Sequence, residues 1–158
     1  MKYYFKVALL LLFFASCKNT KHENLDNSPQ LVVGTYKNDT YTVTSEALIK
    51  QEWERSVSTD EPKKLSDFKI VKTQTQGAAK LDCYLLMART KDNKSSVASL
   101  LIQKDGNFYF DETSGITVLC AGFCAEGCLP IVTFKKGIKQ LVCTVCADCV
   151  KSEMFINL

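Results

Sequence analysis

Histidine is nearly absent from the sequence: the single one, His22, lies in a polar stretch that precedes most of the apolar segments. A Ser–His or Cys–His nucleophile pair therefore cannot be built in the folded part of the chain. The sequence also lacks a glycine-rich phosphate loop, an HExxH motif and a G-x-S-x-G motif. Because the signatures of these enzyme classes are missing, we expect a protein that is not an enzyme.

The chain also lacks a large excess of charge of either sign. It holds 20 Lys and Arg against 17 Asp and Glu, which gives a formal net charge of +3 in 158 residues. Domains that bind nucleic acids usually carry a strong basic excess, so we expect no nucleic-acid partner. Internal repeats and low-complexity segments are missing too, and 46% of the residues are hydrophobic. This composition is typical of one globular domain of ordinary size.

The apolar run at residues 7–14 is too short to cross a bilayer, which takes about 20 residues in a helix. Two lysines precede this run, and the motif Phe14-Ala15-Ser16-Cys17 ends it. A basic start, a short apolar core and small residues before a cysteine resemble the signal peptide and lipobox of bacterial lipoproteins. The resemblance implies that a signal peptidase removes residues 1–16 and that Cys17 carries a lipid such as palmitate.

The same resemblance implies a location in the bacterial cell envelope, with the lipid on Cys17 as the membrane anchor. In such lipoproteins a lysine after the cysteine, like Lys18 here, is compatible with sorting past the inner membrane, so we expect the outer membrane. Residues 17–30 are polar and lack periodicity, which predicts a flexible tether. Seven further cysteines then lie in an oxidising compartment, where disulfides form by default, and their odd number predicts one free thiol.

Hydrophobic periodicity predicts one helix followed by several strands. Ile49, Trp53 and Val57 recur at helical spacing after Ser45, a residue type that favours the N-cap position. Residues 31–36 before the helix are a possible first strand. After the helix the period changes to two, which predicts strands at residues 68–75, 81–89, 96–104, 108–110 and 116–119. The second of these segments is apolar on both faces, as in a central strand that is covered on both sides.

We therefore predict an α+β domain over residues 31–119, in which one N-terminal helix packs on a curled four- to five-stranded antiparallel sheet. This order of elements is similar to that of cystatin-like folds. Residues 120–158 are expected to form a cysteine-rich subdomain that is built on a β-hairpin.

Six of the eight cysteines fall into two C-terminal triplets, Cys120, Cys124 and Cys128, then Cys143, Cys146 and Cys149. The apolar segment 129–142 between them contains Lys135-Lys136-Gly137, which predicts a tight turn between two strands. A hairpin brings together the ends that lie far from its turn, so the two triplets are expected to converge. Counting outward from a two-residue Lys135-Lys136 loop places Cys128 opposite Cys143, which is our best single disulfide pairing. A three-residue loop with Gly137 in the left-handed region would move the register by one.

Three structural disulfides among these six cysteines are the favoured hypothesis, since the hairpin alone is too small to bury a core. A thiolate site for zinc or copper is the main alternative, because soft sulfur ligands suit these metals. An iron–sulfur cluster fits less well, because Glu153 stands where a ferredoxin motif has its fourth cysteine. Thiol–disulfide redox chemistry is a further alternative, although Asp148 beside the C-x-x-C motifs disfavours the thiolate that such chemistry needs.

Cys83 stands apart from the triplets in an apolar strand, and we expect it to be a buried free thiol. The sequence as a whole predicts a lipid-anchored envelope protein with a disulfide-stapled C-terminal module and a non-catalytic binding or structural role. The expected partners are the membrane, through the lipid on Cys17, and a protein or small molecule of unspecified identity. No resident metal is favoured, and zinc or copper is the alternative cofactor.

Overall fold

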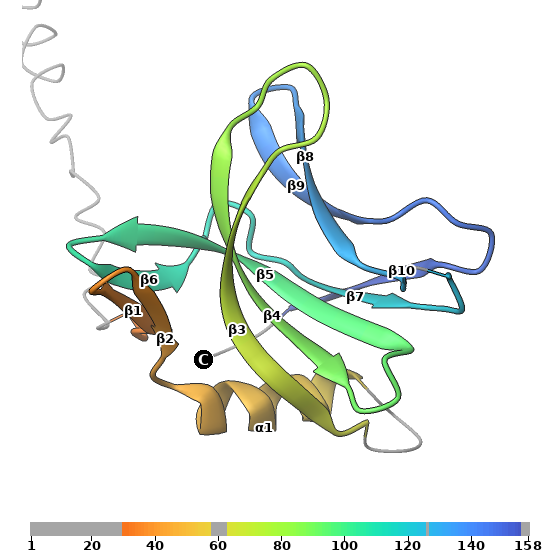
Figure 1. The fold of residues 1–158 in the computed structure, drawn as a ribbon, viewed down its shortest axis with the longest axis horizontal. Coiled ribbons are helices and arrows are strands. Elements are labelled where there is room, and N and C mark those ends of the chain that lie inside the picture. Colours follow the sequence, from red (N-terminus) through yellow and green to blue (C-terminus); the bar gives the residue numbers. More distant parts are fainter. Residues whose placement is uncertain (1–29, 58–62, 126, 156–158) are drawn as a thin grey trace, which may run out of the picture.

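The chain forms ten β-strands and one α-helix within residues 30–57, 63–125 and 127–155, the part that the computed structural model describes (Figure 1). The predicted lipobox with Cys17 and nearly all of the predicted tether lie outside these residues. The elements are β1 (Gly34–Lys37), β2 (Thr40–Val43), α1 (Glu46–Val57), β3 (Leu65–Gln74), β4 (Asp82–Thr90), β5 (Ser95–Lys104), β6 (Asn107–Phe110), β7 (Thr117–Ala121), β8 (Pro130–Lys135), β9 (Ile138–Cys143) and β10 (Val150–Met154).

Eight of these strands form one antiparallel sheet around β5, which pairs with three neighbours. Strand β4 pairs along one edge of β5, while on the other edge β7 pairs with residues 95–99 and β6 with residues 101–104. The sheet continues from β4 to β3, from β6 through β1 to β2, and from β7 to β10. Strand β2 comes back to contact β3, so the strongly curled sheet nearly closes into a barrel (Figure 1).

This mostly β architecture shows that the predicted α+β class was wrong. The sheet has eight strands rather than four or five, and its strand order is not that of one helix packed on a cystatin-like sheet. The prediction missed the short strands β2 and β10, which lie directly before the helix and after the last cysteine. Strand β10 pairs with β7 and β1 pairs with β6, although these partners lie far apart in the sequence. Such non-local pairing leaves no local periodicity from which to predict it.

A β-bulge in β3 helps the sheet to curl. The pairing of β3 with β4 shifts register between Ser66 and Lys69, and Asp67 within the shift has a φ of 56°. A bulge puts one extra residue on one strand, which bends that strand and increases its local twist. Strand β3 therefore bends near its start, where it contacts α1.

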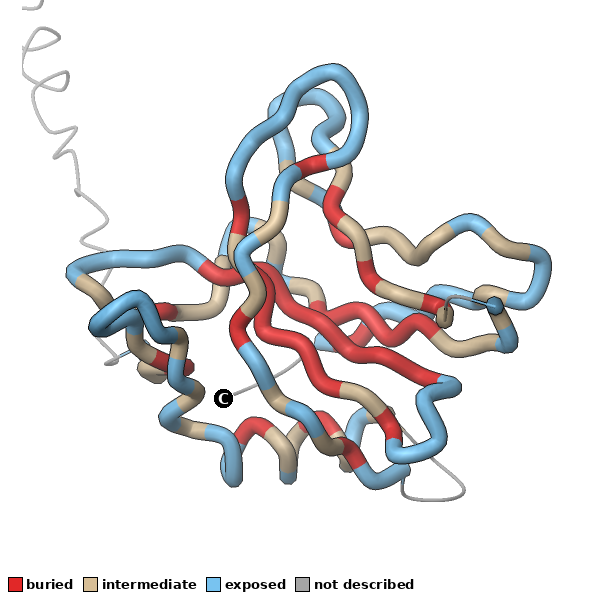
Figure 2. The backbone as a smooth tube through the Cα atoms, viewed as in Figure 1, coloured by how far each residue is buried: buried red, intermediate tan, exposed pale blue. Residues whose placement is uncertain are grey.

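Both faces of the central strands β4 and β5 are buried, which confirms the prediction of a doubly covered strand (Figure 2). In β4, Leu86 and Ala88 face the core that also contains the buried residues of α1. On the opposite face Leu85 belongs to a second core, which the β8–β9 hairpin covers with Val132 and Leu141. The two-stranded sheet β8–β9 is thus packed on the outside of the larger sheet, and the two share a hydrophobic core.

The predicted helix forms, and its apolar stripe packs on the core as expected, with Val57 half-buried. Ile49 and Trp53 are fully buried, and the Trp53 ring lies 5.6 Å from the ring of Phe68 in β3. The carbonyl of Ser45 accepts the first helical hydrogen bond from the Ile49 N–H at 3.1 Å. The Ser45 hydroxyl does not cap the helix but donates to the carbonyl of Val32 at 2.7 Å, which ties the helix start to the strand region. Within the described part of the chain, no helix is long and apolar enough to cross a membrane.

The predicted C-terminal hairpin also forms, but its register differs from the prediction. Its two-residue loop is Lys136-Gly137, with φ values of 51° and 81°, rather than Lys135-Lys136. A type I′ turn requires positive φ at both positions and strongly favours glycine at the second, which explains the shift. Pro130 rather than Cys128 therefore lies opposite Cys143.

Candidate functional site

Three disulfides join the two cysteine triplets in the order of the sequence. They are Cys120–Cys143, Cys124–Cys146 and Cys128–Cys149, with Cα–Cα distances of 5.6, 6.2 and 5.4 Å. This pairing confirms the expectation of disulfides among the six cysteines, while the predicted Cys128–Cys143 bond was wrong. The hairpin register explains the error. Pro130, not Cys128, lies opposite Cys143 at the end of β9, and Cys143 bonds instead to Cys120, the first cysteine of the other triplet.

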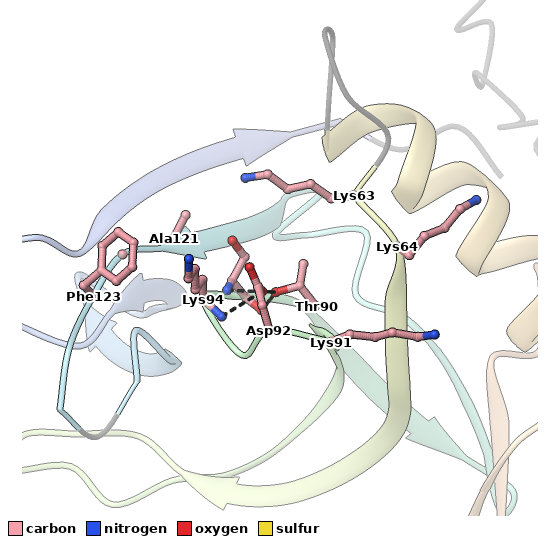
Figure 3. A pocket seen from close by; sticks show the side chains of 10 residues that line it. Lys63, Lys64, Thr90, Lys91, Asp92, Lys94, Ala121 and Phe123 are labelled. Atoms are coloured by element: carbon pink, nitrogen blue, oxygen red, sulfur yellow. Dashed lines mark hydrogen bonds between the residues drawn. The ribbon is translucent and has the colours of Figure 1, made fainter.

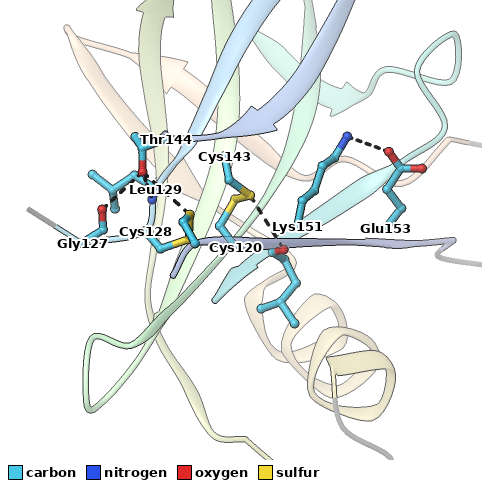
Figure 4. Close-up of a disulfide and its surroundings, with 10 residues drawn as sticks. Cys120, Gly127, Cys128, Leu129, Cys143, Thr144, Lys151 and Glu153 are labelled. Atoms are coloured by element: carbon cyan, nitrogen blue, oxygen red, sulfur yellow. Dashed lines mark hydrogen bonds and ion pairs between the residues drawn. A yellow bond between two sulfur atoms is a disulfide. The ribbon is translucent and has the colours of Figure 1, made fainter. Parts of the chain in front are cut away.

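The disulfides connect elements that belong to different sheets. Cys120 is the fourth residue of β7 in the large sheet, and Cys143 is the last residue of β9 in the small sheet. Cys128 precedes β8 and Cys149 precedes β10, so their bond holds the hairpin to the strand that pairs with β7 (Figure 4). The cross-links therefore fix the small sheet on the outer face of the large one.

The six sulfur atoms form one continuous stack. The Sγ atoms of Cys120, Cys128 and Cys143 all lie within 4.8 Å of one another, and so do those of the other three cysteines. Since Cys128 and Cys149 are bonded, their disulfide lies between the other two. Cys120 and Cys128 are buried, whereas the other four cysteines are half-buried. The stack thus runs from the core toward the surface.

Thr144 holds the second triplet against the first. Its hydroxyl accepts a hydrogen bond from the Leu129 N–H at 3.1 Å and donates to the carbonyl of Gly127 at 3.3 Å (Figure 4). The backbone N–H of Thr144 donates in turn to the carbonyl of Leu129 at 2.9 Å. These bonds extend the β8–β9 pairing past its last strand residue and position both chains for the disulfides.

Cys83 lies in β4 with 2% of its surface exposed and is unpaired in the described part of the chain. Burial raises the pKa of its thiol, and the smaller opposing effect of the Lys139 charge does not cancel this rise. A buried thiol with a raised pKa is a poor nucleophile and packs like a small hydrophobic side chain.

A hollow of about 510 Å³ opens beside the cysteine loops, at the turn between β4 and β5 (Figure 3). Its floor includes Ser95 and Ala121, which are paired across β5 and β7. The lining residues are Lys63, Lys64, Thr90, Lys91, Asp92, Lys94, Ser95, Ala121, Gly122 and Phe123. The lining contains four lysines and one carboxylate, so the hollow is a locally cationic site on a chain with a small net charge.

The lysines differ in direction. In Figure 3 the side chains of Lys63 and Lys94 extend toward Ala121 and Phe123, whereas those of Lys64 and Lys91 extend away from them. The Lys94 ammonium lies over the ring of Phe123, 4.8 Å from the centroid. Phe123 is 72% exposed, so much of its ring remains open to solvent. One end of the hollow therefore combines two ammonium groups with an open aromatic ring.

The turn that carries Lys94 is held by a compact set of hydrogen bonds. The Asp92 carboxylate accepts bonds from the Thr90 hydroxyl at 2.6 Å and from the Lys94 N–H at 3.1 Å. Both bonds hold the pKa of Asp92 below its ordinary value, and the bond from Thr90 has the larger effect. The Thr90 hydroxyl also accepts a bond from the Ser95 N–H at 3.1 Å. The polar groups at the base of the hollow are thus used to fix the turn.

The hollow and the disulfide stack share one wall. Residues 121–123 connect Cys120 to Cys124, both of which are cross-linked to the second triplet. In the middle of this wall the Gly122 N–H donates to the carbonyl of Lys94 at 3.0 Å. The disulfides therefore hold both ends of the segment that presents Phe123.

Sequence reasoning did not find this site. Lys63 precedes β3 and Lys94 lies in the turn between β4 and β5, and only folding places them on one hollow. The one local signal was Phe123, a large aromatic residue among small ones between two cysteines. Cys17, the predicted lipid attachment site, lies outside the described residues.

Comparisons with known proteins add no relative: no family model, no curated protein and no solved structure matches the chain.

Proposed function

We propose that this chain is a lipid-anchored protein of the bacterial cell envelope with a non-catalytic binding role, in which the C-terminal disulfides staple two sheets together. The observation that carries the proposal is the pairing of all six triplet cysteines. Protein disulfides persist in oxidising compartments and are rare in the cytosol of most organisms. A chain with three of them fits a location outside the cytoplasm.

The cysteine count supports a lipid at Cys17. Of the eight cysteines, six are paired and Cys83 is buried in the core, which leaves Cys17 in the lipobox-like motif. The outer membrane is the proposed site of anchoring, on the basis of Lys18. A segment of polar residues between Cys17 and the first strand supplies the tether.

The polar groups of the hollow support binding rather than catalysis. Thr90 and Asp92 are hydrogen-bonded to one another and to the backbone of their own turn. General base or nucleophilic catalysis needs such a group directed at a substrate atom, within hydrogen-bond reach. Here these groups instead fix the geometry of a lysine-bearing turn.

Metabolic labelling tests the anchor. The full chain, expressed with its own N-terminus in a Gram-negative host, is expected to incorporate labelled palmitate and to fractionate with the outer membrane. Cys17→Ala is expected to abolish the label, while Cys83→Ala, which changes an internal cysteine, keeps it. An unlabelled wild-type chain in the cytosolic fraction would overturn the proposal.

A thiolate metal site is the second candidate, because the sulfurs form two groups of three within 4.8 Å. If reduced, these groups offer soft ligands of the kind that zinc and Cu(I) prefer. Intact mass after alkylation without reductant separates the two candidates. A mass six hydrogens below that of the reduced chain, together with a single thiol that is alkylated only after unfolding, supports three structural disulfides. Four or more reactive thiols together with bound zinc or copper would support the metal site.

A further inference from the structure

The geometry points to a specific ligand class for the hollow beside the disulfide stack: a small acidic sugar that carries one carboxylate or phosphate group. The inference deepens the binding role proposed above and concerns the site formed by Lys63, Lys94, Ala121 and Phe123. It does not depend on the lipid anchor, because every group it uses lies in the folded domain.

The anionic group is assigned to the space between Lys63 and Lys94. Both ammonium groups extend toward the same end of the hollow (Figure 3). Lysine binds phosphate and carboxylate as a mobile point charge, and two cations at a concave surface raise the local concentration of anions. Within the described residues, Lys64 pairs with Glu54 at 3.3 Å, whereas no ion pair joins Lys94 to a carboxylate. The Lys94 ammonium contacts the Phe123 ring but neutralises no carboxylate, so its charge is available to an external anion.

The ring of the ligand is assigned to the part of the Phe123 ring that the Lys94 ammonium leaves exposed. A sugar ring has an apolar face of C–H groups, which packs favourably on the electron-rich face of an aromatic ring. Ala121 beside Phe123 has a small side chain and leaves room for this contact. Thr90, Asp92 and Ser95 also line the hollow, but their hydrogen bonds within the turn leave the contact with the sugar to Phe123 and the two lysines.

The size and shape of the hollow favour a small molecule over a membrane surface. Its volume of about 510 Å³ lies in the range of typical small-molecule sites. A lipid surface is met by a flat or convex patch, whereas these residues surround a concavity. One or two sugar units match this volume.

The site is held in shape before any ligand arrives. Disulfides fix the residues on both sides of the 121–123 wall, and the Gly122 N–H bond to Lys94 joins this wall to the β4–β5 turn. The Asp92 hydrogen bonds fix the turn itself. Preorganisation of this kind reduces the entropic cost of ordering the protein when a ligand binds.

Titration calorimetry of the full chain as purified, in neutral detergent, tests the inference. The probes are glucuronate, glucose 6-phosphate, glucose, inorganic phosphate and vesicles that contain an anionic phospholipid. We expect at least one of the two acidic sugars to bind about tenfold more tightly than glucose or inorganic phosphate, and to weaken as salt is added. The acidic sugar that binds more tightly identifies the anionic group as carboxylate or phosphate.

Two variants and one control locate the binding. Lys94→Gln and Phe123→Ala are each expected to weaken binding of the acidic sugar about tenfold. Lys104→Gln is the control, because Lys104 is an exposed lysine of β5 that lies outside the hollow. The single tryptophan, Trp53, is buried, and its fluorescence reports whether each variant is folded.

Three outcomes would overturn the inference. Unchanged affinity in folded Lys94→Gln and Phe123→Ala would remove the site from this hollow. Inorganic phosphate that binds as tightly as the sugar phosphate would show an adventitious ion only. Binding to anionic vesicles without binding to either sugar would assign the surface to the membrane. None of these results affects the palmitate label at Cys17, so failure here is distinguishable from failure of the anchor.

Discussion

Gly122 lies so close to the backbone carbonyl of Asp148 that no side chain fits between the two residues. A Cβ built on Gly122 would overlap the Asp148 carbonyl oxygen and lie 3.0 Å from the Cα of Cys149. The segment after the first cysteine of one triplet thus passes directly against the backbone of the other triplet. This contact joins the wall of the hollow to the disulfide stack.

We predict that Gly122→Ala lowers the free energy of unfolding by about 1–3 kcal/mol, because overpacking forces the backbone to move. The Asp148 carbonyl is main chain and cannot rotate away as a side chain would. Denaturant unfolding followed by the fluorescence of Trp53 measures the change.

Gly137→Ala is the matched control for this prediction. Both glycines have a positive φ, of 156° at Gly122 and 81° at Gly137. At Gly137, however, nothing lies within 4 Å of the position of an added Cβ. Its substitution therefore reports the conformational strain alone. Equal losses in the two variants would show that the Asp148 contact contributes nothing.

The second prediction concerns the disulfides, which close sequence separations of 21 to 23 residues. A loop of this length constrains the unfolded chain by about 3 kcal/mol, and less when two parallel cross-links remain. Since the three separations are nearly equal, differences between double variants report native-state packing. We expect Cys120→Ala with Cys143→Ala to cost more than Cys124→Ala with Cys146→Ala, because Cys120 is fully buried.

Urea unfolding of both double variants measures this order. Loss of the cross-link itself is expected to lower the free energy of unfolding of each variant by at most about 3 kcal/mol. The variant without Cys120–Cys143 also loses packing in the core. A greater loss of stability on removal of Cys124–Cys146 would contradict the assignment of Cys120–Cys143 to the shared core.

The third prediction concerns Cys83, whose burial raises the pKa of its thiol. Without reductant, iodoacetamide at neutral pH is expected to label the native Cys17→Ala chain, in which Cys83 is the one thiol outside the disulfides, very slowly and to add one equivalent after unfolding. The thiolate is the reactive form, and both burial and the raised pKa suppress it. Mass spectrometry follows the reaction, and rapid labelling of the native chain would place Cys83 at the surface.

The fourth prediction concerns acid stability. Hydrogen bonds from the Thr90 hydroxyl, which has the larger effect, and from the Lys94 N–H hold the pKa of Asp92 below the ordinary value of 3.8. The stabilisation is therefore fully present above about pH 4 and is lost as the pH falls through the lower value in the folded state. Asp92→Asn is expected to be less stable than wild type at neutral pH, with the difference shrinking in acid.

Urea midpoints at pH 7, 4 and 2 test this dependence. The shrinking difference is the diagnostic result, because both chains share every other titrating group. Parallel curves for the two chains would show that the Asp92 bonds do not contribute.

The local features of the fold could be predicted from the sequence. The spacing of Ile49, Trp53 and Val57 predicted the helix, and the double-sided apolarity of residues 81–89 predicted a central strand. A glycine in the segment between the triplets predicted the hairpin turn. Each of these features depends on residues a few positions apart, where backbone geometry and side-chain type decide together.

The register of that hairpin shows where local reasoning ends. Moving the loop from Lys135-Lys136 to Lys136-Gly137 shifted the residue opposite Cys143 from Cys128 to Pro130. The turn type was decided by one glycine, and the consequence for the disulfides was a different pairing. Six cysteines allow fifteen pairings, and the sequence alone does not distinguish them.

What the sequence by itself determined is the presence of one helix, a central buried strand, a C-terminal hairpin and enough neighbouring cysteines to form disulfides. Only the tertiary structure decided the barrel-like closure, the partner of each cysteine and the meeting of Lys63, Lys94 and Phe123 on one hollow. The physical reason is that these features depend on pairings between distant strands, such as β5 with β7 and β7 with β10. Such pairings are selected by the packing of the whole core and not by the spacing of neighbouring residues.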